Sequence, residues 1–205
     1  MSTKLPFSLA RSERVYLRHP RKVDAEEFSR LVIASRSFLQ PWVTPPLTPE
    51  AYDRYLQGSR RESVCAFLVC RIDDRRIVGV CNLSQILRGN LAQALLGYWV
   101  GTAFAGRGYM SEALHLVLRY AFANLKLHRI EANVQPQNGN SKALLVRVGF
   151  RLEGFSPRYL KVVGRWRDHE RWAIYREDWS SQAKQERANA RGCHNSAIVT
   201  ADGIL

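Results

Sequence analysis

A long amphipathic helix, directly preceded by a glycine-rich turn, constrains this fold more than any other feature of the sequence. Apolar residues recur at helical spacing from Met110 to Leu125, so one face of the helix must pack against a core. An apolar run over residues 94–100 precedes the turn and is typical of a strand. The middle of the chain is therefore a strand, a turn and a helix. The apolar helix positions are Met110, Ala113, Leu114, Val117, Leu118, Ala121, Phe122 and Leu125.

Further strands and helices are expected on both sides of this unit. Helices should begin at Asp24 and Thr48, whose side chains can accept free first-turn amides, and a third should end before Gly149. This order of elements predicts a mixed α/β or α+β domain. The expected strands span residues 15–18, 64–72, 77–83, 94–100, 129–134, 150–163 and 167–175.

The length of the chain suits one domain with a sizeable core. Of its 205 residues, 46% are apolar and 24% are charged, which excludes a mainly disordered chain, a collagen and a small disulfide-stabilised protein. We expect an N-terminal arm over residues 1–11, a folded domain over residues 12–179 and a tail over residues 180–205. The tail is expected to be disordered or loosely attached, because apolar periodicity stops at its start.

Charge and cysteine content indicate a cytoplasmic protein that approaches polyanions. The formal net charge of +13 favours nucleic acid, the ribosome, an anionic membrane surface or a phosphorylated cofactor as a partner. The apolar runs are too short to cross a bilayer, and the N-terminus lacks the apolar stretch of a signal peptide. The four cysteines form no C-x-x-C pair, so we expect buried thiols in a reducing compartment and no metal site.

The turn before the long helix is a candidate phosphate-binding site. Gly106 and Gly108 permit a tight turn and leave amide N–H groups unobstructed, while the first amides of the helix have no partner within it. A diphosphate fits this positive end of the helix dipole, and Arg107 would add a cation. The alternative is an ordinary loop. The turn matches neither a P-loop nor a Rossmann fingerprint.

The residues around this turn resemble the GNAT superfamily of acetyl-CoA-dependent N-acetyltransferases. The diphosphate loop of that family reads Gln/Arg-x-x-Gly-x-Gly/Ala. Gly106 and Gly108 occupy its glycine-rich turn, whereas Ala105 and Met110 depart from it at either end. About 30 residues later, the sequence resembles the family's Asn-x-x-(Ser/Ala)…Gly-Phe helix. The matching residues there are Asn138, Ser141, Gly149 and Phe150.

A narrower likeness is to the RimJ-type ribosomal-protein alanine N-acetyltransferases, and it covers residues 12–179. This resemblance implies a GNAT fold, with a central, mostly antiparallel twisted sheet of about six or seven strands flanked by about four helices. Segments that carry the likeness are Pro41-Trp42, Leu87-Arg88-Gly89, the stretch from Gly106 to Leu114, His128-Arg129-Ile130 and the stretch from Gly164 to His169.

The implied reaction is direct attack of the N-terminal alanine amine of a ribosomal protein on the thioester of acetyl-CoA. An α-amino group has a pKa of about 7.7–8.0, so part of it is neutral near pH 7. No metal is implied. The residues implied to bind acetyl-CoA are Tyr98, Trp99, Val100, Gly106, Arg107, Gly108, Tyr109, Met110, Ser111, Asn138 and Ser141.

Catalysis in this family needs a backbone amide that polarises the thioester carbonyl and an acid that protonates the thiolate. The resemblance assigns the amide to Tyr98, Trp99 or Val100. Leu145 stands where many members have the tyrosine acid, and Ser141 is the nearest substitute. The alternative role of Ser141 is to cap its own helix.

The base is the least defined group. Asn133 stands where related enzymes have a glutamate, and an amide cannot take a proton. Glu131 lies two residues earlier on the same face of its strand, so it is a candidate base acting through a water molecule. Its alternative role is an ion pair with Arg129 or Arg147. Loss of the proton to bulk water before binding is also open.

Four residues are candidates for contact with the acceptor peptide: Trp42, Trp166, Asp168 and His169. The alternatives are a core position for Trp42 and a surface hairpin for the other three. Two rival functions remain open, namely a GNAT enzyme acting on a small-molecule amine and a basic RNA- or DNA-binding module. Electrostatic contact with the ribosome or its RNA is compatible with the enzyme. The sequence leaves open whether the protein is a monomer or a dimer.

Overall fold

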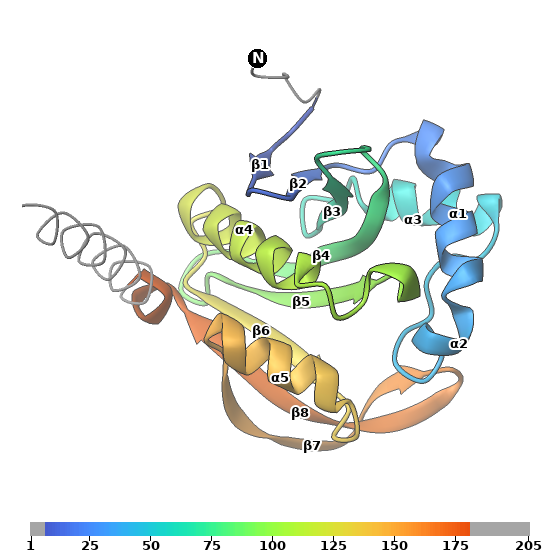
Figure 1. The fold of residues 1–205 in the computed structure, drawn as a ribbon. Helices are drawn as coiled ribbons and strands as arrows, with labels where there is room; N and C mark the ends of the chain where they lie inside the picture. Colours follow the sequence, from blue (N-terminus) through green and yellow to red (C-terminus); the bar gives the residue numbers. More distant parts are fainter. Residues whose placement is uncertain (1–6, 181–205) are drawn as a thin grey trace, which may run out of the picture.

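The computed structural model describes residues 7–180, which form one eight-stranded sheet with helices on both faces (Figure 1). The strand order is β1-β2-β3-β4-β5-β6-β8-β7, and every neighbouring pair is antiparallel except β5 and β6. The strands are β1 (Ala10–Arg11), β2 (Val15–Arg18), β3 (Cys65–Arg71), β4 (Ile77–Leu87), β5 (Gln93–Val100), β6 (Arg129–Val134), β7 (Arg151–Val162) and β8 (Arg165–Tyr175).

The predicted mixed architecture with a mostly antiparallel sheet is confirmed. The strand count exceeds the expected six or seven, because a short edge strand, β1, pairs with β2. An additional helical turn, α2, which the sequence analysis did not predict, precedes the Pro41-Trp42 segment. The α-helices are α1 (Ala25–Ala34), α2 (Arg36–Leu39), α3 (Pro49–Gly58), α4 (Tyr109–Ala123) and α5 (Gly139–Val148), and 3₁₀ turns occupy Lys22–Asp24 and Thr102–Phe104.

The sheet has a core on each face. The larger core lies under α4 and α5, and it contains the apolar stripe that the sequence predicted for α4, including the fully buried Leu114 and Leu118. The smaller core lies under α1 and α3, where Phe28 packs against Tyr52 with ring centroids 4.8 Å apart. Alternate residues of one strand therefore enter different cores. The opposite faces of β5 consequently have different surroundings.

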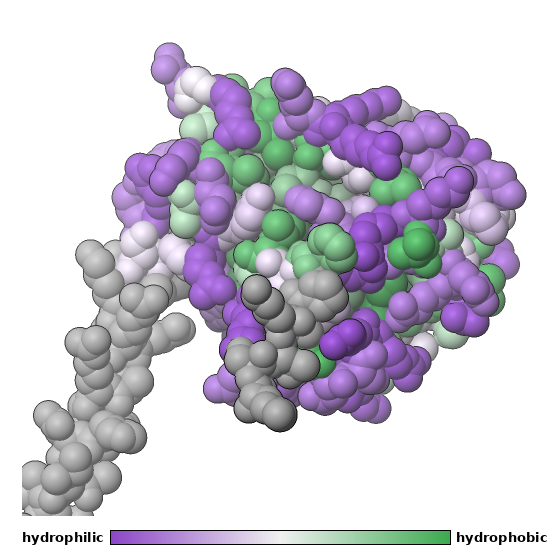
Figure 2. All heavy atoms as spheres, turned by 90° about the horizontal axis from the view of Figure 1, so that it is seen from above, coloured by the Kyte–Doolittle hydropathy of each residue, from purple (hydrophilic) through white to green (hydrophobic). Residues whose placement is uncertain are grey.

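Hydrophilic residues cover most of the outer surface, and apolar residues gather toward the middle of the face seen from above (Figure 2). Cys65, Cys70 and Cys81 are buried free thiols, whereas Cys193 lies outside the described residues. Across residues 7–180, no helix combines the length and apolarity needed to span a bilayer. Most of the predicted arm and nearly all of the predicted tail, residues 1–11 and 180–205, also lie outside the described residues.

Asp24 has a different role from the helix cap that its position suggested. Its side chain makes no capping hydrogen bond to α1. Instead, its carboxylate accepts hydrogen bonds from both terminal nitrogens of Arg18, at 2.7 and 2.8 Å, and from the Arg21 amide. Both partners of this ion pair are almost fully buried, with side chains 6% and 5% exposed. Removing either partner of such a buried ion pair is strongly destabilising, because the other charge is left buried without compensation.

We expect Asp24→Ala to lower the free energy of unfolding by about 3–5 kcal/mol, because it leaves the Arg18 charge buried without a counterion. Urea denaturation followed by circular dichroism measures this loss. The matched control is Glu26→Ala, which breaks an exposed pair with Arg30 on the same helix. It should change stability by no more than about 0.5 kcal/mol. Equal losses in the two variants would contradict this account.

Candidate active site

The site is a cavity that opens where two neighbouring strands separate. β5 and β6 run parallel, and they pair only from Gln93–Arg129 to Leu95–Glu131. Beyond that point their C-terminal halves make no ladder with each other. A cavity of about 470 Å³ lies there, lined by both strands, by the N-terminal turns of α4 and α5, by the segment 38–43 and by His169 of β8.

The turn into α4 presents backbone amides to this cavity. Gly106 and Gly108 have backbone φ angles of +72° and +81°, which residues other than glycine adopt only with strain. Gly108 is the N-cap and offers no side chain to the helix. Within residues 7–180, the amides of residues 106–111 have no hydrogen-bond acceptor, and the next amide, that of Glu112, bonds to the Gly108 carbonyl at 3.2 Å. The turn thus combines unpaired N–H groups with the positive end of a helix dipole.

Arg14 of the β1–β2 loop holds this turn from outside. Its guanidinium donates to the Arg107 carbonyl at 3.1 Å and to the Glu112 carboxylate at 2.5 Å. Burial raises the pKa of Glu112, but hydrogen bonds from Ser12 and Arg14 outweigh it and leave that pKa below its ordinary value. Glu112 therefore fixes the turn as an anion rather than acting on a ligand. The Arg107 side chain does not line the cavity.

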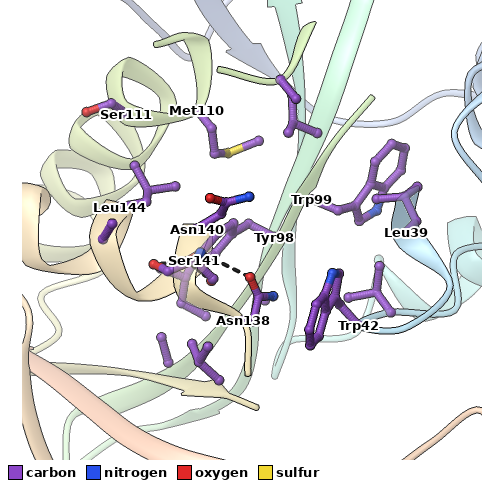
Figure 3. Close-up of a pocket in the computed structure, with 18 of the residues that line it drawn as sticks. Leu39, Trp42, Tyr98, Trp99, Met110, Ser111, Asn138, Asn140, Ser141 and Leu144 are labelled. Atoms are coloured by element: carbon purple, nitrogen blue, oxygen red, sulfur yellow. Dashed lines mark hydrogen bonds between the residues drawn. The ribbon is translucent and has the colours of Figure 1, made fainter. Parts of the chain in front are cut away.

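Tyr109 also points away from the cavity. Its ring packs edge-on against Phe104, with centroids 6.3 Å apart, and the Arg14 guanidinium lies 5.0 Å from the centre of the ring. Of the implied cofactor residues in this helix, Met110 and Ser111 line the cavity (Figure 3). The amide of Tyr109, rather than its side chain, belongs to the candidate phosphate site.

The first turn of α5 places a hydroxyl pair in the cavity. The Asn138 side chain accepts the Ser141 amide at 3.1 Å, so Asn138, and not Ser141, caps this helix. The Ser141 hydroxyl is instead 2.5 Å from the Tyr98 hydroxyl of β5 (Figure 3). Burial raises the pKa of Tyr98 far enough that it keeps its proton at physiological pH. The pair therefore holds two protons, of which one lies in the mutual hydrogen bond.

Strand register decides which amides of β5 face β6. Gly101 donates its N–H to the Val78 carbonyl at 2.8 Å, and the β4–β5 pairing continues in register from there. Antiparallel neighbours alternate between hydrogen-bonded and non-hydrogen-bonded pairs. The Trp99 amide therefore points to β4, whereas the amides of Tyr98 and Val100 point toward β6 and the cavity.

Four residues form the wall of the cavity on the opposite side of the sheet from α5. Trp99 is held by an edge-on contact with Phe28, with ring centroids 5.5 Å apart, and Trp42 stands beside it (Figure 3). Gln135 donates to the Pro41 carbonyl at 3.0 Å and so fixes the loop that carries Trp42. His169 completes this wall and is only 3% exposed.

The structure separates the other two candidate acceptor residues from the cavity. Trp166 is 62% exposed near the tip of the β7–β8 hairpin. The Asp168 carboxylate accepts the Arg158 amide at 2.7 Å across the same hairpin, at an irregularity in its register. Neither residue lines the cavity, because side chains alternate along β8 and His169 is the one directed there.

Glu131 is engaged in a charge network instead of facing the cavity. Arg129 bonds to Glu131 at 2.8 Å and also to Glu153, and Asn133 donates to Glu131 at 3.0 Å. This is the ion-pair alternative that the sequence left open for Glu131. Asn133 lines the cavity, and its side-chain oxygen Oδ1 is buried without a hydrogen-bond partner within residues 7–180.

Several cavity residues were absent from the sequence analysis. Gln135 belongs to no motif, and its partner lies 94 residues away. Trp42 was a candidate from the sequence, but the apolar residues near it could not be assigned to the cavity before the fold was known. The lining residues missed in this way are Phe38, Leu39, Val43, Leu96, Gly97, Phe104, Ala132, Val134, Gln135, Asn140, Ala143 and Leu144.

Comparison with known proteins places this geometry in one family. Residues 14–151 match the family described as acetyltransferase (GNAT) domain. YjcK of Bacillus subtilis (strain 168), named a probable N-acetyltransferase, is 34% identical over 83% of this chain and 98% of its own. The [ribosomal protein uS5]-alanine N-acetyltransferase of Escherichia coli (strain K12) is 33% identical over 82% of this chain and 91% of its own.

The solved structures agree with the sequence comparisons. The structure of Mycobacterium smegmatis RimJ in complex with CoA-disulfide superposes with a TM-score of 0.74 at 36% identity, covering 80% of this chain and 82% of that one. The chain therefore belongs to the GNAT family of acetyltransferases, which take the acetyl group from acetyl-CoA, and the predicted GNAT fold is confirmed. Within that family, its relatives include ribosomal-protein-alanine acetyltransferases of the RimJ type.

Proposed function

We propose that this protein transfers the acetyl group of acetyl-CoA to the N-terminal alanine amine of a ribosomal protein. The observation that carries the proposal is a cavity between separated strands, with free amides at the α4 turn on one side and an aromatic wall with His169 on the other. The relative from Escherichia coli, which is named for this reaction, supports the choice of acceptor. A net charge of +13 would draw such an enzyme to the polyanionic ribosome.

The residues of the α4 turn suit the diphosphate of acetyl-CoA. Gly106 has no side chain to fill the space in front of the amides, and a Cβ there would meet no atom within 4 Å. The unpaired amides of residues 106–111 supply donors that need no rearrangement. We assign the pantetheine arm to the gap between β5 and α5, which Tyr98, Ser141 and Leu144 line.

Two groups of the chain would act on the thioester. The amide of Tyr98 or Val100 points toward the space between β5 and β6 and would donate to the carbonyl oxygen as negative charge develops there. The Ser141 hydroxyl, held by Tyr98, would give its proton to the departing thiolate. The amine forms its bond to the carbonyl carbon as the carbon–sulfur bond breaks, so no acetyl-enzyme is required.

The acceptor is tested with peptides that begin with alanine. We expect incubation with acetyl-CoA to add one acetyl group to the N-terminus of such a peptide, and intact-mass analysis of purified ribosomal proteins should show the same change. The same peptide with a blocked N-terminus is the control and should remain unmodified. Acetylation of a polyamine or an amino-acid amine without acetylation of the peptide would instead identify a small-molecule GNAT enzyme.

A further inference from the structure

His169 is a buried imidazole in the cavity wall that Trp42 and Trp99 also form, and the chemistry proposed above gives it no role. It lies on β8, on the same face of the sheet as Asn133. The neighbouring Glu170 points to the other face, where it pairs with Lys142 of α5. Trp42 and Trp99 line the cavity on this face, and an acceptor amine would reach the thioester from this side. The position of His169 therefore suits contact with the amine rather than with acetyl-CoA.

The hydrogen bonding of His169 leaves one ring nitrogen available. Its Nδ1 lies 2.9 Å from the Arg167 carbonyl. A carbonyl oxygen only accepts hydrogen bonds, so Nδ1 carries the proton and the neutral ring has its lone pair on Nε2. Within the described part of the chain, Nε2 has no hydrogen-bond partner, and it is not sealed from the cavity.

The carboxylates around the site are already engaged. Glu131 is bound by Arg129 and Asn133, and Glu170 by Lys142 at 3.3 Å. Asp168 accepts the Arg158 amide. Among the cavity-lining residues that the structure describes, the ones that titrate are Tyr98, Arg147 and His169, and of these only His169 presents a basic lone pair near neutral pH.

We propose that Nε2 of His169 accepts a proton from the N-terminal ammonium of the acceptor. This inference rests on the proposed function and names the base for it. The proton moves from the ammonium nitrogen to Nε2, and the freed amine lone pair then attacks the thioester carbonyl carbon as the carbon–sulfur bond breaks. The nitrogen loses a second proton as the amide forms, and this proton replaces the one that Ser141 gives to the thiolate. The resulting imidazolium returns its proton to water after the product leaves, so each turnover restores the neutral ring.

The surroundings of His169 keep it neutral in the working pH range. Burial lowers its pKa below 6.5, while the Arg167 carbonyl and the Asp168 carboxylate act in the opposite direction more weakly. From β7, the Tyr159 ring faces it at 6.3 Å, and the Arg147 cation from α5 lines the same cavity. The neutral form is the proton acceptor, so the proposed activity is present above this pKa and falls as pH drops through it.

The test is the pH dependence of kcat/KM for His169→Gln with an alanine-initiated peptide. Without a base, the variant must capture amine that is already neutral, which is only about 5% of the acceptor at pH 6.5 but roughly nine tenths at pH 9. We expect a loss of about 30-fold at pH 6.5 that shrinks to about 3-fold or less at pH 9. His128→Gln, on an exposed histidine paired with Glu177, is the matched control and should follow the wild type.

Four outcomes decide the inference. A loss that diminishes with pH, together with a wild-type acidic limb below pH 6.5, supports a base. A constant ratio at all pH values, with acetyl-CoA binding retained, means a structural role and overturns this inference alone. The wild-type profile provides an independent criterion if the variant folds poorly, because an acidic limb near pH 8 would also overturn it. An inactive wild type overturns the proposed acceptor and this inference together.

Discussion

Gly106→Asp should weaken the binding of acetyl-CoA by about 100-fold, or roughly 2.8 kcal/mol. The new side chain would occupy the open space in front of the α4 amides, and its carboxylate would repel a diphosphate there. Because no atom lies within 4 Å of the new Cβ, the fold should suffer only from the φ angle of +72°. Isothermal titration calorimetry with acetyl-CoA measures the affinity directly.

Gly89→Asp is the matched control for this experiment. Gly89 has a φ angle of +66°, and a Cβ there also meets nothing within 4 Å, but the residue lies outside the cavity lining. Both variants should therefore lose similar stability from backbone strain, about 1–2 kcal/mol at most. Only Gly106→Asp should lose affinity. Unchanged acetyl-CoA binding in Gly106→Asp would remove the assignment of the α4 turn to the diphosphate.

Ser141→Ala should reduce kcat by about 100-fold while the KM for acetyl-CoA changes little, because the hydroxyl is needed when the thiolate departs. Tyr98→Phe should reduce kcat by about 10-fold, since it removes the group that positions the Ser141 hydroxyl. The double variant should be no slower than Ser141→Ala, as expected for two groups that act as one unit. Steady-state kinetics at saturating peptide give all three values.

Tyr55→Phe tests whether loss of a buried phenol alone explains such effects. The Tyr55 hydroxyl donates to Asn82 at 2.9 Å, and burial raises its pKa as it does that of Tyr98, but Tyr55 does not line the cavity. Its removal should cost about 1 kcal/mol of stability and leave kcat intact. A kcat for Ser141→Ala within twofold of the wild type would show that the thiolate takes its proton from water instead.

Local sequence patterns predicted the parts of the site that depend on neighbouring residues. The apolar stripe of α4 and the two glycines before it are such patterns, so both the helix and the amide-rich turn were expected. Strand spacing likewise placed Glu131 beside Arg129 as one of its possible partners. In each case the interacting residues are close in sequence or share one periodic element.

Contacts between distant segments account for what the sequence did not predict. Ser141 was weighed as a helix cap or an acid, and its hydrogen bond with Tyr98, 43 residues away, forms only because the fold brings the first turn of α5 to β5. Gln135 was missed for the same reason. Within the hairpin, His169, Asp168 and Trp166 were treated alike, and only the register of β8 separates the cavity residue from its neighbours.

The alignment of β4 with β5 has a consequence for how this chain tolerates changes in length. A displacement of one residue would turn the Trp99 amide toward the space between β5 and β6. It would also carry the Tyr98 phenol to the other face of the sheet, away from Ser141, so both proposed functions of β5 would disappear together. The irregularity between Ser84 and Leu87 lies between the connecting loop and this region. Insertions in that loop can thus be absorbed before they reach the chemistry, whereas an insertion within 95–100 cannot.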